Sequence, residues 1–255
     1  MKIIIFGGTT EGRELSLELA SEGADVTVSV ASEYGVEEQN DDYGIVIEEG
    51  PKTADEMRLL IKGADLCVDA THPYAVIVSE NIRTAANREG VELLRLKRGS
   101  VSLDHLASEE NIIIAESPED AARIASGYSG RILLTTGSKD LPVYAKAMDP
   151  ERLYPRVLPL SSSIEACEQA DIPHRNIIAL QGPFSAAFNK AVISEYHIDL
   201  LITKESGKTG GFAEKIIACE ECGIPAIVIA RPADEGLSFE EVSRLCMEKI
   251  HGEKK

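Results

Sequence analysis

The chain has few basic residues and no long hydrophobic run. Its 255 residues include 26 Lys and Arg against 43 Asp and Glu, which gives a formal net charge of −17. Such an excess of acid argues against broad binding to nucleic acid or to an anionic membrane surface, because both need a basic face. No apolar stretch reaches the roughly 18–20 residues of a transmembrane helix. We therefore expect neither nucleic acid nor a membrane among the partners.

A disulfide framework is also missing. The five cysteines are an odd number and are scattered along the chain, unlike the paired spacing of small secreted proteins. The apolar segment at the N-terminus, Met1–Phe6, is too short for a signal peptide and runs directly into a glycine turn. These features predict a reduced, soluble, cytoplasmic protein.

Short β-branched runs alternate with helical stretches in the first hundred residues. The strands expected are 2–6, 25–30, 43–47, 65–70 and 91–96, and the helices are 13–22 and 73–89. Strands separated by helices predict βαβ units and a parallel sheet. The strands are continuously apolar, which favours a sheet covered on both faces.

A polar stretch at 97–110 interrupts this pattern, and we place a domain boundary there. The alternation then resumes, with strands expected at 112–115, 131–135, 177–180, 199–203 and 226–230, and helices at 118–126, 161–169, 185–195, 212–222 and 238–250. Ser117-Pro118 reads as a helix start and Gly223 as a helix stop. The predicted fold is α/β with two Rossmann-like domains, 1–97 and 98–255, each a parallel sheet flanked by helices.

In open parallel sheets, ligands bind beyond the carboxyl ends of the strands. Small, hydroxyl-bearing and basic residues gather at these positions, where helix N-termini offer free N–H groups to phosphates or carboxylates. The loops concerned are 7–12, 69–74, 135–139, 181–185, 203–211 and 230–232. Both halves are therefore expected to bind anionic ligands.

The first of these loops predicts a dinucleotide site. It keeps three glycines in a strand–turn–helix without being the G-x-G-x-x-G pattern, and a ligand-free tight turn is the alternative interpretation. The residues assigned to the cofactor are Gly7, Gly8, Thr9, Thr10, Glu11, Gly12, Arg13, Ser29, Thr71 and His72. Because no acid stands at Ser29-Val30-Ala31-Ser32 to bind ribose hydroxyls, NADPH is favoured and NADH is left open.

Other catalytic motifs are missing. There is no Walker loop, no G-x-S-x-G elbow, and no Tyr-x-x-x-Lys pair of a short-chain-type dehydrogenase, because Tyr74 and Tyr144 lack a lysine four residues on. Cys219-x-x-Cys222 falls late in a predicted helix without a second pair of ligands, and the histidines show no ligand spacing. We expect no protein-bound metal.

Several motifs occur together in a specific order. They are Ile5–Arg13, Asp69–Ala75, Leu134–Lys139, Arg156–Pro159, Gln181–Ser185, Thr203–Gly207, Gly210-Gly211 and Arg231-Pro232. This ordered series resembles the precorrin-6A reductases of cobalamin (vitamin B12) biosynthesis, including the cobalt-precorrin-6A reductases, over nearly the whole chain. The resemblance implies hydride transfer from a reduced nicotinamide to a ring carbon of an anionic tetrapyrrole, in a cleft between a cofactor domain and a substrate domain.

The second half carries the basic loops that such a polycarboxylate substrate needs. The residues expected to bind it are Thr136, Gly137, Ser138, Lys139, Arg156, Gln181, Gly182, Lys204, Glu205, Ser206, Gly207 and Arg231. Lys208 adds a further charge in the same region. The candidate proton donors are His72, Tyr74 and Lys204, with solvent as the alternative. Direct hydride transfer from the nicotinamide needs mainly that the two reacting carbons be held close together in a dry site. We expect no flavin.

Two other functions are consistent with the same fold. One is a non-catalytic nucleotide-binding regulatory module, which would lack the second set of basic loops. The other is a different NADP-dependent reductase of an anionic substrate. The sequence leaves open whether the substrate carries cobalt, and whether the protein is a monomer or a small homo-oligomer.

Overall fold

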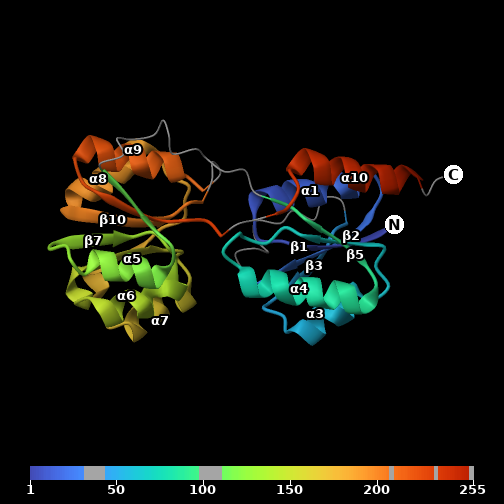
Figure 1. Cartoon of the computed structure of the whole chain (residues 1–255), viewed down its shortest axis with the longest axis horizontal. Helices are drawn as coiled ribbons and strands as arrows, with labels where there is room; N and C mark the ends of the chain where they lie inside the picture. The colour runs from blue at the N-terminus through green and yellow to red at the C-terminus, as the bar shows by residue number, and fades with distance from the viewer. Residues whose placement is uncertain (32–43, 98–110, 207–209, 233–234, 253–255) are drawn as a thin grey trace. The chain divides into compact units, whose positions relative to one another are not determined.

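The computed structural model describes residues 1–31, 44–97, 111–206, 210–232 and 235–252. It divides into two compact units: unit 1 comprises Met1–Gly99 and Pro232–Lys255, and unit 2 comprises Ser100–Arg231. Each unit is a parallel sheet with helices on both faces (Figure 1). The predicted α/β class, with two Rossmann-like parallel sheets, is confirmed.

The sheet of unit 1 has five strands in the order β3-β2-β1-β4-β5, all parallel. The strands are β1 (Lys2–Phe6), β2 (Asp25–Val30), β3 (Val46–Glu49), β4 (Leu66–Asp69) and β5 (Glu92–Arg95). The chain builds outward from β1 to β3 and then returns to the other side of β1 with β4. The strand order therefore reverses between β1 and β4.

The alternating sides of β1 bury against two different pairs of helices. Ile3 and Ile5 pack toward α1 and α10, whereas Ile4 and Phe6 pack toward α3 and α4 (Figure 1). The helices are α1 (Thr10–Ser21), α3 (Ala54–Ile61), α4 (Val76–Glu89) and α10 (Phe239–Gly252). Full burial of both faces explains why the strand is apolar at every position.

The C-terminal segment belongs to unit 1, so the prediction of a single domain over 98–255 is wrong for its last part. Leu237 forms a bridge with Leu96 beside β5, donating its N–H to Arg95 O at 2.8 Å. Val242 and Cys246 of α10 are fully buried in the core that α1 covers. An amphipathic helix needs a partner surface for its apolar face, and α1 provides part of it. The predicted boundary at 98–110 lies outside the described residues.

Unit 2 contains a six-stranded parallel sheet in the order β6-β11-β10-β7-β8-β9. The strands are β6 (Ile112–Ala115), β7 (Arg131–Leu134), β8 (Leu153–Val157), β9 (Ile178–Ala179), β10 (Ile198–Lys204) and β11 (Ala226–Ile229). The chain runs from β7 outward to β9, then returns to the other side of β7 with β10. The order reverses between β7 and β10.

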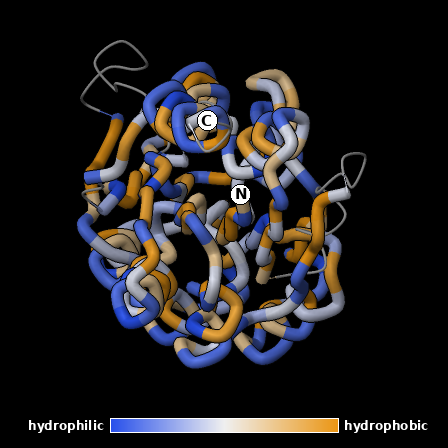
Figure 2. The backbone as a smooth tube through the Cα atoms, turned by 90° about the vertical axis from the view of Figure 1, so that its right-hand side faces the viewer, coloured by the Kyte–Doolittle hydropathy of each residue, from blue (hydrophilic) through white to orange (hydrophobic). Residues whose placement is uncertain are grey.

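Helices cover both faces of this second sheet, with α8 and α9 on one side and α5, α6 and α7 on the other (Figure 1). Their bounds are α5 (Pro118–Ala125), α6 (Leu141–Ala147), α7 (Ser161–Gln169), α8 (Ala186–Glu195) and α9 (Phe212–Cys222). Ser117 caps α5 by accepting from Asp120 N, and Gly223 ends α9 in the left-handed conformation, as predicted. Along the tube in Figure 2, the helical stretches carry both hydrophilic and hydrophobic residues, as amphipathic helices do.

Two α-helices and one strand were not predicted, namely α3, α6 and β8. The short helix α3 has a capping box between Thr53 and Glu56, a sequence signal that was present but not used. The helix α6 spans only 7 residues and β8 contains Pro155, and both features weaken the usual patterns. Within the described residues, β3 begins at Val46 rather than at the predicted position 43.

Candidate functional site

The strand reversal in unit 1 brings two loops together at the carboxyl edge of the sheet. The β1–α1 turn follows β1, and the β4–α4 loop follows β4. The Thr9 hydroxyl donates to Ala70 O at 2.9 Å, which ties the two loops directly. A reversal of this kind is where open α/β sheets bind their ligands.

The β1–α1 turn brings the start of α1 close to β4. Thr9 is the N-cap of α1, and its hydroxyl oxygen accepts from Gly12 N at 3.1 Å. A Cβ on Gly12 would lie 2.8 Å from Ala70 Cβ, so only glycine permits this approach. Gly8 has a φ of +113°, a backbone conformation that residues other than glycine rarely adopt. The turn therefore has the features of a phosphate-binding helix N-terminus.

The residues of this turn differ in their exposure to solvent. Gly8 and Thr10 are exposed, whereas Gly7, Glu11 and Arg13 are half-buried. Arg13 Nε is buried without a hydrogen-bond partner among the described residues. An unmatched donor of this kind at the turn suits an anionic ligand.

Ser29 lies inside β2 rather than beyond its end. It is 6% exposed, pairs in register with Phe6, and accepts through its carbonyl from Gly7 N at 2.8 Å. The backbone of Ser29 therefore fixes the start of the turn. The residues that follow β2 at 32–43 lie outside the described residues.

An ion pair organises the β4–α4 loop. Asp69, at the end of β4, is 2% exposed, and its Oδ1 lies 2.8 Å from Arg95 Nη1 at the end of β5. The same Oδ1 accepts from Thr71 N at 3.0 Å and from the Thr71 hydroxyl at 2.7 Å. The pair holds Thr71 in place beside Ala70. Asp69 belongs to a predicted motif without being a predicted site residue, and Arg95 was not predicted, although both stand at strand ends.

His72 and Tyr74 lie together on this loop. Their rings stack with centroids 5.5 Å apart, and Tyr74 N donates to His72 Nδ1 at 3.4 Å. A hollow of about 550 Å³ lies beside them, lined by Pro73, Val76, Ser79, Glu80, Arg83, Arg95, Pro232, Glu235 and Gly236. Loop and hollow share the carboxyl edge of the sheet, so the predicted residues Thr71, His72 and Tyr74 fall in one place.

The strand reversal in unit 2 is bridged by a second ion pair. Lys204 Nζ, at the end of β10, lies 2.7 Å from Asp140 Oδ2 in the loop after β7. The two side chains are 18% and 17% exposed. Sequence reasoning assigned Lys204 and the neighbouring Lys139 but missed Asp140. The paired carboxylate offsets the lysine charge.

Arg156 of β8 has a different environment. Its Nη1 donates to Asn189 Oδ1 at 2.7 Å, and its guanidinium lies 4.7 Å from the centroid of the Phe184 ring. Burial lowers the pKa of this guanidinium to about 10. Asn189 is in turn fixed by donating to Ser185 O at 2.9 Å. Arg156 is therefore held between α8 and the loop before it.

The remaining predicted substrate residues lie at the same edge of unit 2. Thr136 is buried, Ser138, Glu205, Ser206 and Arg231 are half-buried, and Gly137, Lys139, Gln181 and Gly182 are exposed. Gly207 and Lys208 lie outside the described residues. One contact in this set is Arg231 Nη2 to Glu205 O at 3.5 Å.

Ser206 and Gly210 contact each other between β10 and α9. The Ser206 hydroxyl donates to Gly210 O at 3.1 Å, and a Cβ on Gly210 would lie 2.3 Å from Ser206 Oγ. Lys215 of α9, which is 7% exposed, also donates to Gly210 O, at 3.2 Å. Sequence reasoning missed Lys215, because a lysine in a helix is typical of an exposed face.

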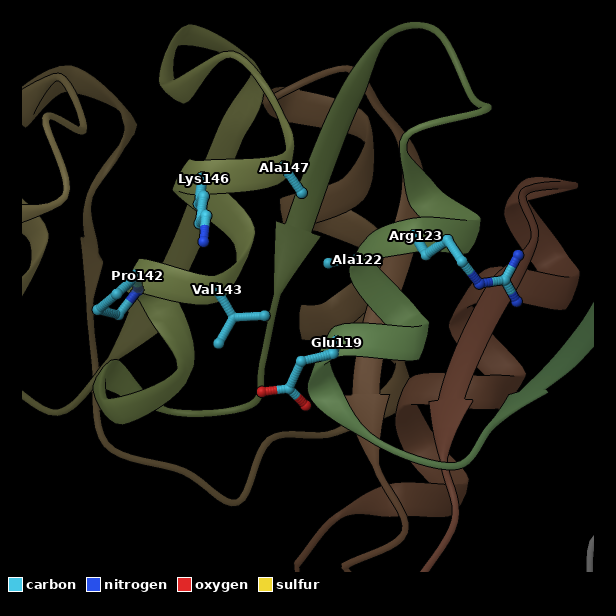
Figure 3. A pocket seen from close by; sticks show the side chains of 7 residues that line it. All are labelled: Glu119, Ala122, Arg123, Pro142, Val143, Lys146 and Ala147. Carbon is cyan, nitrogen blue, oxygen red and sulfur yellow. The ribbon is translucent and has the colours of Figure 1, made fainter.

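A further groove of about 550 Å³ lies between α5 and α6. In Figure 3, Val143 and Ala147 of α6 and Ala122 of α5 lie along the space between the two helices, whereas the Arg123 guanidinium extends away. This groove lies on a helical face and not at the strand ends, so it is not part of the candidate site.

Within the described residues, no group of three or more His, Cys, Asp or Glu side chains could hold a metal ion. Over the same part of the chain, no helix is both long enough and apolar enough to cross a bilayer.

The chain is similar to known proteins over nearly its whole length. It is 35% identical to a cobalt-precorrin-6A reductase of Priestia megaterium, with 94% of this chain and 96% of that protein covered. It is 38% identical to a cobalt-precorrin-6A reductase of Salmonella typhimurium, with 90% and 87% covered. A precorrin-6A reductase of Rhodococcus erythropolis is 33% identical, with 91% and 89% covered.

The fold is also that of a solved structure. The structure described as CobK precorrin-6A reductase superposes with a TM-score of 0.75 at 22% identity, covering 99% of this chain and 98% of that one. The model of the family described as Precorrin-6x reductase CbiJ/CobK matches residues 2–247. The chain, an α/β protein with two parallel sheets, therefore belongs to the precorrin-6x reductase family of oxidoreductases in cobalamin biosynthesis.

Proposed function

We propose that this protein reduces a macrocycle double bond of precorrin-6A or of cobalt-precorrin-6A, with NADPH as the reductant. The observation that carries the proposal is the hydrogen bond from Thr9 to Ala70, which joins the β1–α1 turn to the β4–α4 loop in a chain of a reductase family. A reductase needs a reducing cofactor, and this edge has the form of a dinucleotide site. The names of the relatives include both macrocycles, so both are substrates to be tested.

The residues of unit 1 fit a dinucleotide. Gly12 draws the N-terminus of α1 against Ala70, so the positive end of the helix dipole lies at the carboxyl edge of the sheet, where a pyrophosphate would bind. The unmatched Arg13 Nε supplies a donor nearby. No acidic side chain stands at Ser29, Val30 or Ala31 to exclude a 2′-phosphate, which favours NADPH over NADH. When bound, the reduced nicotinamide supplies the hydride.

The residues of unit 2 would hold the carboxylates of the substrate. Lys139, Arg156 and Arg231 present cations at the carboxyl edge of the sheet. Charge-assisted hydrogen bonds from such groups position an anionic ligand. Lys204 contributes less, because the Asp140 carboxylate already forms an ion pair with its ammonium.

Among the three candidate proton donors, the geometry favours His72. Its Nδ1 accepts from Tyr74 N, so the proton of the neutral ring lies on Nε2, where it can be donated. Tyr74 then acts by orienting the imidazole through its stacked ring. Hydride transfer and protonation of the neighbouring carbon together reduce the double bond.

The test is turnover with both macrocycles and both nicotinamides, followed by macrocycle absorbance. NADPH deuterated at the transferred position should place deuterium on a carbon of the product, and EDTA should leave the rate unchanged. Deuterium lost to solvent, or no turnover of either macrocycle, contradicts the proposal. Calorimetry of NADPH with a folded Gly8→Val variant separately tests the cofactor site, since a bulky side chain at Gly8 should weaken binding strongly.

A further inference from the structure

Two phenylalanines, the half-buried Phe184 and the exposed Phe188, form an aromatic pair at the carboxyl edge of unit 2. Phe184 lies in the loop between β9 and α8, and Phe188 lies in the first turn of α8. Their rings stack with centroids 4.6 Å apart and planes inclined by 16°. Phe188 is 37% exposed, and Leu180, directly after β9, is 40% exposed. Large apolar side chains exposed together mark a binding surface more often than isolated ones do.

The pair is built rigidly. Ser185 caps α8 by accepting from Phe188 N at 3.2 Å, which fixes the turn between the two rings. Gly182 approaches the Phe184 ring so closely that a Cβ there would lie 3.1 Å from Cε2. Asn189, which is 2% exposed, holds the loop carbonyls of Phe184 and Ser185 through its amide. An exposed apolar surface on a fixed support is preorganised for a ligand.

A cation that has no anionic partner in the part of the chain that the structure describes lies against this pair. The guanidinium of Arg156 contacts the Phe184 ring, and its one hydrogen bond among the described residues is to the neutral Asn189 side chain. A guanidinium has five N–H donors, and a half-buried one is normally matched by a carboxylate. Burial alone lowers the pKa of Arg156, to about 10.

One other basic group at this edge is satisfied differently. Lys204 has the Asp140 carboxylate at 2.7 Å. Arg156 has no carboxylate of this kind among the described residues, so an anionic ligand can supply its counter-charge. The aromatic pair and the Arg156 guanidinium together fit a ligand that has an apolar ring face and a carboxylate on the periphery of that ring.

We infer that Phe184 and Phe188 form an aromatic shelf for one face of the macrocyclic substrate, and that Arg156 binds an acidic side chain of that ring. The inference rests on the proposed function for the identity of the macrocycle. The shelf sets substrate specificity, because a planar or gently curved ring gains stacking contact there that a small acid cannot.

The experiment compares Phe188→Ala, Phe188→Tyr and Arg156→Gln with wild type. Leu59→Ala is the control, since Leu59 is an exposed apolar residue on a helix of unit 1, 63% exposed and outside the candidate site. Two quantities are measured: KM for the macrocycle in turnover, and Kd for an octacarboxylate porphyrin by absorbance titration. Melting temperatures show that each variant folds.

Phe188→Ala should raise both constants about tenfold, the order of one lost aromatic contact, with KM for NADPH unchanged. Phe188→Tyr should stay near wild type because the ring is kept, and Leu59→Ala should match wild type. Arg156→Gln should raise both constants by at least tenfold through loss of a charge-assisted bond. Glutamine keeps an amide donor for Asn189 Oδ1, so Arg156→Gln should still fold, which its melting temperature checks.

Failure of the inference is distinguishable from failure of the proposed function. Turnover with constants that do not respond to Phe188→Ala overturns the shelf and leaves the reductase proposal standing. Porphyrin binding that depends on Phe188, without turnover, supports the shelf and contradicts the reductase proposal. If Phe188→Ala instead converts a dimer to a monomer in sedimentation, the surface is an interface between two copies of the chain and the inference is wrong.

Discussion

Lys204 Nζ lies 2.7 Å from Asp140 Oδ2, and this ion pair spans the reversal of strand order in unit 2. Lys204 ends β10, whereas Asp140 follows β7, so the contact joins the loops of two neighbouring parallel strands. The carboxylate offsets the charge that a substrate anion would otherwise meet. The sign of its effect on binding can be predicted.

Asp140→Asn should lower KM for the macrocycle severalfold, because the Lys204 ammonium then interacts with a substrate carboxylate without competition. Lys204→Ala should raise that KM on the order of tenfold, the loss of one charge-assisted hydrogen bond. Steady-state kinetics with varied macrocycle at saturating NADPH measure both. A higher KM in Asp140→Asn would mean that Asp140 positions the lysine rather than competing for it.

Gly12→Ala should weaken both folding and NADPH binding. The new Cβ would lie 2.8 Å from Ala70 Cβ and 3.2 Å from Thr9 Oγ1, so α1 must move away from β4. Overpacking of this kind costs roughly 1–3 kcal/mol. Gly127→Ala is the matched control, since a Cβ there meets only Ile124 O at 3.4 Å and should be nearly neutral. Urea unfolding and calorimetry with NADPH test the pair of variants, and equal NADPH affinity in both would remove the turn from the cofactor site.

The Asp69–Arg95 pair should contribute more to stability than a surface pair does. Arg95→Met leaves the Asp69 carboxylate buried without its cation, which typically costs about 3–5 kcal/mol. Arg58→Met breaks the more exposed pair with Glu89 and should cost less than about 1 kcal/mol. Chemical denaturation followed by circular dichroism compares the two. Similar losses would show that Asp69 is satisfied by Thr71 alone.

The strand ends could be predicted from the sequence because the apolar runs of a doubly covered sheet are unmistakable. Lys2–Phe6 and Asp25–Val30 are strands with the predicted bounds, and helix 212–222 coincides with α9. The first glycine turn was likewise found from its three glycines. These features are local, so a single stretch of sequence contains the whole signal.

The side-chain partners could not be predicted, because they join residues far apart in the chain. Arg95 reaches back 26 positions to Asp69, and Lys204 reaches Asp140 from a different strand. The return of α10 to unit 1 is of the same kind. An amphipathic helix shows which of its faces is buried but not which surface buries it, so 238–250 was assigned to the wrong domain.

The buried thiols predict a loss of stability in alkali. Burial raises the pKa of Cys246 to about 12, whereas the unfolded thiol ionises near its ordinary value of 9.0. Between these values the unfolded state binds fewer protons than the folded state, so stability falls as pH rises, by about 1.4 kcal/mol per pH unit for one such group. Cys246→Ala removes this group, and its stability deficit relative to wild type should therefore shrink from pH 9 to pH 11. Val242→Ala, a truncation in the same helix at a residue that is also 0% exposed, should keep a constant deficit. Urea midpoints at several pH values measure both, and parallel behaviour of the two variants would show that Cys246 does not control the alkaline loss.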